Sequence, residues 1–218
     1  MRTTLVIVLL ALACALLGAG EPLQYDRVAV HGGEVWRFAT ASLVHWSWDQ
    51  LIWDAIAFAA LGFVAAKAWP VRFHLAAVAS AIAIPVIVHV AVPNVMTYRG
   101  LSGIDSALFA LVALRLAKQT RSPMFLLCLG GFVLKVGFEV ATGSTLFVRE
   151  LAPGVTAMPL AHVIGGAIGI LAALLPELRL QRPQFLGERG HRFLESLHAR
   201  GQRLSGGALR RALVGEHR

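Results

Sequence analysis

The sequence predicts an all-α polytopic membrane protein built as one bundle of six transmembrane helices. Of its 218 residues, 57% are hydrophobic and only 15% are charged, and the mean hydropathy is +0.68. This composition is rare in a soluble domain of that length. The apolar residues fall in long runs, as membrane spans require. Both cysteines, Cys14 and Cys128, lie within such runs, so they favour neither a disulfide framework nor a thiolate metal site.

Six apolar runs follow one another along the chain. The first covers residues 3–17 behind Arg2. It has features of a signal peptide, but "LLGAGEPLQ" offers only a weak cleavage site, so we expect a retained helix. The other runs cover about residues 51–66, 73–92, 101–114, 124–140 and 155–175. We therefore expect a membrane domain at residues 1–178 and a basic tail, partly disordered or amphipathic, at residues 179–218.

Lysine and arginine predict the orientation of these spans. If the N-terminus is cytoplasmic, that side holds Arg2, Lys67, Arg72, Arg115, Lys118, Arg121 and the nine arginines between 179 and 218. The opposite side holds only Arg27, Arg37, Arg99 and Arg149. Positive charge gathers at the cytoplasmic face, so we expect both termini in the cytoplasm. For the basic tail we favour membrane lipids as partners over nucleic acid.

Polar groups in three of the predicted spans lie at one height. From Asp54, Ser102 and His162 to the cytoplasmic ends of their spans is 13 or 14 residues, which is roughly 20 Å of helix. Because these spans run in the same direction, the three groups should lie level, about 10 Å below the outer surface of the membrane core. Gln50 precedes Asp54 by four residues and shares its helix face. Polar groups at this depth usually face each other or a wet cavity.

Ser102 and His162 are the candidate nucleophile and general base. Glycines flank Ser102, while Gly165 and Gly169 form a G-x-x-x-G face beside His162, and such faces let helices pack backbone to backbone. Close packing would bring a histidine nitrogen within reach of the serine oxygen, the minimal nucleophile and base pair. A lone serine or histidine in a membrane helix is more often a packing or structural polar residue. The shared height favours the chemical interpretation.

Three motifs, in order along the chain, resemble those of the rhomboid family. "GEVWRFATASLVH" resembles the first-loop pattern Glu-x-Trp-Arg-x-x-Thr running into a histidine, here His45. "GLSG", from Gly100, resembles the nucleophile motif, and "AHVIGGAIG", from Ala161, resembles the motif of the basic histidine. Their order is similar to that of the six-helix bacterial core, over about residues 3–176. The resemblance implies an intramembrane serine protease of the bacterial inner membrane, with a Ser102–His162 dyad and neither metal nor cofactor.

The resemblance also implies an oxyanion site beside Ser102. The Ser102 N–H would contribute at the start of its helix, with Gly100, His45, Gln50 and Asp54 as auxiliary candidates. Many rhomboids carry His and Asn at the positions of Gln50 and Asp54, and that Asn donates to the oxyanion. An ionised Asp54 would repel it. Either Gln50 supplies the donor, or burial keeps Asp54 protonated, or the protein is inactive.

Within the family, the chain is most similar to rhombosortases. The segments "GLSG", "LKVGFEVATGSTLFV" and "PGVTAMPLAHVIGGAIG" carry this resemblance. It implies exported transmembrane substrates with a C-terminal Gly-Gly, a hydrophobic helix and a basic cluster, cleaved near the glycines. The alternatives are a general rhomboid protease, an inactive rhomboid-like binding protein, and a small transporter. A transporter is expected to show internal repeats, and none is clear.

Charged residues within the spans carry two further expectations. Lys135 and Glu139 are four residues apart in the fifth run, so we expect an ion pair along one helix. Asp105 follows Ser102 by three residues. It either complements the positive end of its helix or orients His162 as the third member of a triad.

Overall fold

The computed structural model describes residues 2–143 and 158–176, which are helical apart from loops and two strands of two residues each. Six longer helices coincide with the six predicted runs: α1 (Arg2–Leu16), α5 (Trp48–Ala68), α6 (Pro70–Ala91), α7 (Ser102–Thr120), α8 (Pro123–Thr142) and α9 (Pro159–Leu174). The beginning of the sixth run and the predicted basic tail lie outside the described residues.

Several of these helices are candidate membrane spans. Among the described residues, α5, α6 and α8 are long and apolar enough to cross a membrane, while α1 and α9 are apolar but shorter. Helix α7 has 19 residues and carries Asp105, Arg115 and Lys118. The chain is therefore a membrane protein with several candidate spans, and the six-transmembrane arrangement stays a prediction.

Local sequence signals set the helix boundaries. The Ser47 side chain caps α5 by accepting the Gln50 N–H at 3.1 Å, which satisfies a donor that the helix itself leaves unpaired. Helices α6, α8 and α9 each have proline in the first turn, where its missing N–H costs nothing. Gly143 ends α8 with a φ of +68°, the left-handed conformation that glycine adopts at helix ends.

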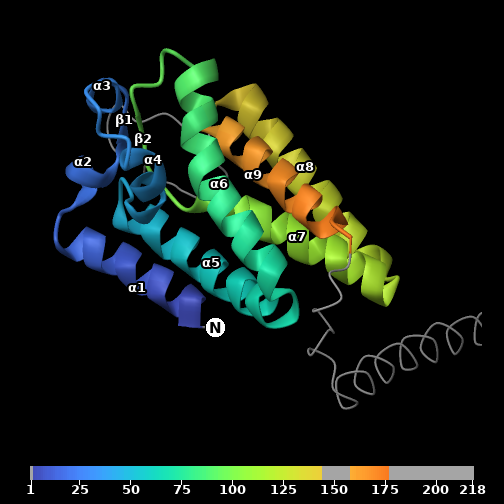
Figure 1. Cartoon of the computed structure of the whole chain (residues 1–218). Coiled ribbons are helices and arrows are strands. Elements are labelled where there is room, and N and C mark those ends of the chain that lie inside the picture. The colour runs from blue at the N-terminus through green and yellow to red at the C-terminus, as the bar shows by residue number, and fades with distance from the viewer. Residues whose placement is uncertain (1, 144–157, 177–218) are drawn as a thin grey trace, which may run out of the picture. The chain divides into compact units, whose positions relative to one another are not determined.

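Helix α7 is the central helix of the bundle. It packs against α5, α6, α8 and α9 (Figure 1), and most of its apolar side chains are buried, with Leu108 and Leu111 fully so. Helix α7 continues to Thr120, six residues beyond the end of the predicted apolar run at residue 114. Arg115 is buried and its guanidinium lies 5.6 Å from the Trp69 ring centre. Arg115 thus packs on the turn between α5 and α6, where Trp69 lies.

One end of the bundle is held together by Arg72, near the beginning of α6. Its guanidinium donates to the carbonyl oxygens of Ala172 at 2.6 Å and Leu175 at 2.8 Å, at the end of α9. These carbonyls have no partner within their own helix. The ends of α5 and α9 therefore lie at the same end of the bundle as Arg115, and α5, α7 and α9 run in one direction, as predicted.

The other end of the bundle is covered by the segment between α1 and α5. It contains α2 (Gly20–Leu23), β1 (Tyr25–Asp26), α3 (Arg27–His31), α4 (Arg37–Thr40) and the 3-10 helix η1 (Ala41–Leu43). Strand β1 pairs antiparallel with β2 (Thr97–Tyr98), with Tyr25 opposite Tyr98. Arg37 braces this segment by donating to the carbonyl oxygens of Glu21 and Gln24. The pairing holds this segment against the residues that precede Ser102.

Candidate active site

Ser102 begins α7 directly after a tight turn, and its side chain is half-buried. Gly100 forms this turn with a φ of +123°, a conformation that side-chain-bearing residues rarely adopt. The Gly100 N–H donates to Ala41 O at 3.2 Å, and the Tyr98 hydroxyl donates to Gly100 O at 3.4 Å. The turn that presents Ser102 is thus fixed from both β2 and η1.

The beginning of α7 leaves backbone donors beside the Ser102 side chain. The Leu101 N–H donates to Asp54 Oδ2 at 3.1 Å, and the N–H groups of Ile104 and Asp105 donate to Leu101 O. The N–H groups of Ser102 and Gly103 make no hydrogen bond within residues 2–143 and 158–176. Such groups carry the partial positive charge of a helix N-terminus. They are suited to hold a negative oxygen.

Helices α7 and α9 touch backbone to backbone next to Ser102 and His162. A Cβ on Gly103 would lie 3.1 Å from Ala161 O, and one on Gly165 would overlap Gly103 O. A Cβ on Gly169 would likewise overlap Ala107 O. The small residues of the G-x-x-x-G face therefore set the distance between the two helices. Ser102 and His162 are each one residue away from the Gly103–Ala161 contact.

The Ser102–His162 dyad stays a prediction. His162 is 7% exposed and Ser102 is half-buried. Among the described residues, Ser102 Oγ and the imidazole are not hydrogen-bonded to each other. Catalytic hydrogen bonds are often long before substrate binds, so this geometry is compatible with a dyad that forms in the complex.

The imidazole of His162 is bonded to Glu139 on α8. Its Nδ1 lies 2.8 Å from Glu139 Oε2, and Lys135 Nζ lies 2.8 Å from the same carboxylate oxygen. Glu139 is 1% exposed. The predicted Lys135–Glu139 ion pair is confirmed, and it is extended by His162 from the neighbouring helix.

Asp105 is not the carboxylate partner of His162, so the proposed triad with Asp105 is wrong. Neither Asp105 oxygen has a hydrogen-bond partner within the described part of the chain. Its carboxyl lies instead toward Asp54 and Tyr98: burial first, and then the charges of Asp54 and Asp105, raise the pKa of the Tyr98 phenol. Tyr98 therefore stays protonated and donates a hydrogen bond to Gly100 O.

Sequence reasoning misses the contact between Glu139 and His162. The predicted ion pair along α8 neutralises both Lys135 and Glu139, so the sequence gives no reason to look for a further partner of Glu139 on another helix. A signal was present: Glu139 lies toward the outer end of its run, the same end as Ser102 and His162. An ionisable group at that height usually faces the other polar groups.

Asp54 and His45 lie beside the turn that precedes Ser102. Asp54 Oδ2, which accepts the Leu101 N–H, is also 3.3 Å from His45 Nε2, although that pair lacks hydrogen-bond geometry. Asp54 is 5% exposed. Its carboxylate is thus occupied in fixing the residue before Ser102.

The Gln50 amide is directed toward the same turn. Its Oε1 accepts the Trp46 N–H at 2.9 Å, which fixes the orientation of the amide. Its NH₂ group lies on the side of Gly100. A Cβ on Gly100 would lie 2.5 Å from Gln50 Nε2, and Nε2 donates a long hydrogen bond to Arg99 O at 3.5 Å. The role of Gln50 as an oxyanion donor stays a prediction.

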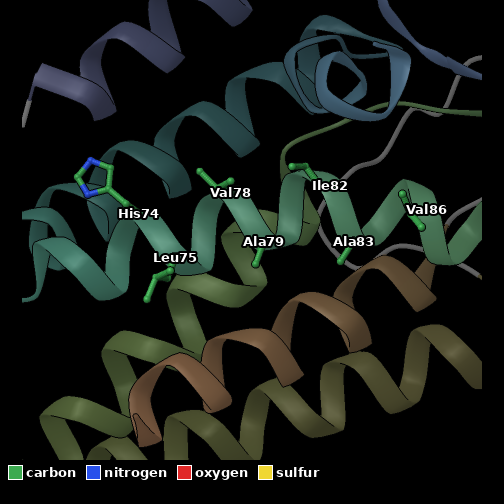
Figure 2. Close-up of a pocket in the computed structure, with 7 residues that line it drawn as sticks. All are labelled: His74, Leu75, Val78, Ala79, Ile82, Ala83 and Val86. Carbon is green, nitrogen blue, oxygen red and sulfur yellow. The ribbon is translucent and has the colours of Figure 1, made fainter. Parts of the chain in front are cut away.

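A separate hollow of 560 Å³ runs along one face of α6 (Figure 2). It is lined by His74, Leu75, Val78, Ala79, Ile82, Ala83 and Val86. None of the candidate site residues contributes to it, and its apolar lining suits lipid. Within residues 2–143 and 158–176, no three His, Cys, Asp or Glu side chains gather as a metal site.

Comparison with known proteins identifies one family. The model described as "Rhomboid domain" matches residues 32–176, which is more than half of the chain. The match contains the turn at Gly100, Ser102, Glu139 and His162. No match to a curated protein was found.

Proposed function

The chain belongs to the rhomboid family, and we propose on that premise that it is an intramembrane serine endopeptidase with Ser102 as nucleophile and His162 as general base. Members of this family are typically intramembrane serine proteases. One observation carries the assignment to these residues. The helix that begins at Ser102 packs through Gly103 directly on Ala161, the neighbour of His162.

The reaction proceeds in two steps. Ser102 Oγ attacks the carbonyl carbon of the scissile peptide bond, and His162 takes the hydroxyl proton as the C–O bond forms. The C–N bond then breaks, and His162 gives its proton to the leaving amine. A water molecule, deprotonated by His162, hydrolyses the resulting ester, which releases the new carboxyl end and restores Ser102.

The negative oxygen that forms in each step needs donors that are already in place. The N–H groups of Ser102 and Gly103 make no hydrogen bond to the described residues, and the Gln50 amide lies against the same turn. One such donor typically contributes about 10²–10³-fold in kcat. Asp54 supports these groups by holding the Leu101 N–H.

Cleavage of a transmembrane reporter by the purified protein in lipid vesicles tests this proposal. We expect Ser102→Ala and His162→Ala each to abolish cleavage, and Ser102→Ala also to abolish labelling by a fluorophosphonate. Two matched controls keep cleavage: Ser80→Ala, at a buried serine of α6 without a hydrogen-bond partner among the described residues, and His74→Ala, at an exposed histidine. Reporter that is bound but never cut by the unmutated protein would instead indicate an inactive binding protein.

The substrates are exported proteins with a C-terminal Gly-Gly, an apolar helix and a basic cluster. The segments "LKVGFEVATGSTLFV" and "PGVTAMPLAHVIGGAIG", through their resemblance to rhombosortases, support this class. Glycines also release their chain readily into the extended form that a protease needs. Two reporters that differ only in Gly-Gly versus Val-Val test it. Equal cleavage of both would indicate a general rhomboid protease.

The protein lies in the bacterial inner membrane as six spans, with both termini and the tail of residues 179–218 in the cytoplasm. The distribution of lysine and arginine supports this orientation. The shared direction of α5, α7 and α9 supports it as well, because Arg72 and Arg115 then lie at the cytoplasmic end.

A further inference from the structure

Three ionisable side chains meet where α8 packs beside α9 (Figure 1). Glu139 Oε2 lies 2.8 Å from His162 Nδ1 and 2.8 Å from Lys135 Nζ, while Lys135 Nζ lies 3.2 Å from His162 Nδ1. Val136 and Glu139 are the buried residues of α8, and its remaining described side chains are largely exposed. Glu139 is thus one of the few side chains of α8 that point into the bundle, and there its carboxylate meets His162.

The short distance to Glu139 defines where the imidazole carries its proton. Lys135 beside the carboxylate keeps Glu139 ionised, because a buried charge persists when an opposite charge pairs with it. An ionised carboxylate only accepts hydrogen bonds. The 2.8 Å contact therefore needs a proton on Nδ1, and a neutral ring then has its lone pair on Nε2. That is the tautomer that can accept the proton of a serine hydroxyl.

Lys135 makes the choice of tautomer dependent on Glu139. The ammonium group also lies within reach of Nδ1 and can only donate. If the carboxylate were absent, Lys135 would donate to Nδ1, and the neutral ring would carry its proton on Nε2. A histidine in that form has no lone pair for the serine proton.

We propose that Glu139 is a positioning residue that completes a Ser102–His162–Glu139 triad, with Lys135 neutralising its charge. This inference rests on the proposed function. Glu139 holds the imidazole in its base form before the reaction. It stabilises the imidazolium after the proton has moved from Ser102 to Nε2, and no proton passes to the carboxylate.

Kinetics of Glu139→Gln give the first test, in the same vesicles and with the same reporter. The amide keeps the size of the side chain but loses the charge. We expect kcat to fall by about 10⁴-fold, which is the loss in a soluble serine protease whose histidine takes the wrong tautomer. KM should stay unchanged because Glu139 acts through His162. Glu139→Asp should recover part of kcat, and Asp105→Asn is the control that should retain it.

The ring itself gives a second test that does not depend on activity. Nitrogen NMR of protein labelled at histidine should show the proton of the neutral His162 ring on Nδ1. The signals are assigned by their loss in His162→Ala. In Glu139→Gln the proton should move to Nε2.

Two results would overturn the inference: a proton on Nε2 in the unmutated protein, or an unchanged kcat in Glu139→Gln. If the unmutated protein neither cleaves a reporter nor reacts with a fluorophosphonate, the proposed function fails separately. The nitrogen spectrum then still decides whether Glu139 sets the tautomer. If Glu139→Gln does not fold, the spectrum of the unmutated protein decides alone.

Discussion

Replacing Gly165 with alanine would add one methyl group at the contact between α7 and α9. The new Cβ would overlap Gly103 O and lie 2.8 Å from the Gly103 carbonyl carbon, whereas carbon atoms normally pack at about 3.5–4.0 Å. Both partners are backbone, so no side-chain rotation can relieve the overlap. Helix α9 would have to move away from α7 by about 1 Å.

This displacement has two measurable consequences. Overpacking of this kind typically costs about 1–3 kcal/mol, which outweighs the gain of about 1 kcal/mol from replacing glycine with alanine in a helix. The displacement also occurs next to Ser102 and His162. A misplacement of about 1 Å can cost about 10²-fold in rate, so we expect Gly165→Ala to lose that much kcat while it still accumulates in the membrane.

Gly130→Ala in α8 is the matched control. A Cβ on Gly130 meets nothing within 4 Å, so this variant should keep full activity and melt at the same temperature or slightly higher. Reporter cleavage and thermal unfolding in detergent measure both variants side by side. If Gly165→Ala cleaved at the unmutated rate, the close approach of α7 and α9 would have no part in aligning the site.

Further changes test the surroundings of the site and the orientation of the chain. Gln50→Leu removes the amide donor and should lower kcat about 10²–10³-fold with little change in KM; an unaltered kcat would exclude Gln50 from the oxyanion site. Asp54→Leu leaves the Leu101 N–H without its acceptor and should lower stability by about 1–3 kcal/mol in thermal unfolding, whereas Asp54→Asn keeps an accepting oxygen and should unfold near the unmutated protein. Alkaline phosphatase fused after Val95 should be active in bacteria and inactive when fused after Arg121, and the reverse pattern would invert the proposed topology.

The helices and the height of their polar groups follow from the sequence because both depend on local features. Long apolar runs predict the six helices, and counting residues from the cytoplasmic ends places Asp54 and Ser102 at one level. The bond from the Leu101 N–H to Asp54 Oδ2 agrees with that level. The overlap that Gly165 and Gly169 avoid is likewise readable as a G-x-x-x-G pattern.

The partners of individual side chains do not follow from the sequence. Which face of α8 meets α9 depends on how the helices rotate about their axes, and an apolar run with little amphipathic pattern does not specify that rotation. The sequence therefore predicts Lys135 as the partner of Glu139 and gives no indication of His162. The pairing of Tyr25 with Tyr98 is hidden for a related reason, since strands of two residues have too few positions to show alternation.

The hydrogen bonds around Ser102 leave unpaired the groups that the proposed reaction uses. The Leu101 N–H is taken by Asp54, the Gly100 N–H by Ala41 O, and His162 Nδ1 by Glu139. Ser102 Oγ, the N–H groups of Ser102 and Gly103, and His162 Nε2 make no hydrogen bond to the described residues. In the proposed reaction a bound peptide would meet these groups: its carbonyl oxygen would accept from the two N–H groups, and its carbonyl carbon would meet Ser102 Oγ. The Asp105 carboxyl also has no hydrogen-bond partner among the described residues, and the proposed reaction gives it no role. The Asp105→Asn variant therefore shows the effect of changing a buried carboxyl that does not contact His162, for comparison with Glu139→Gln.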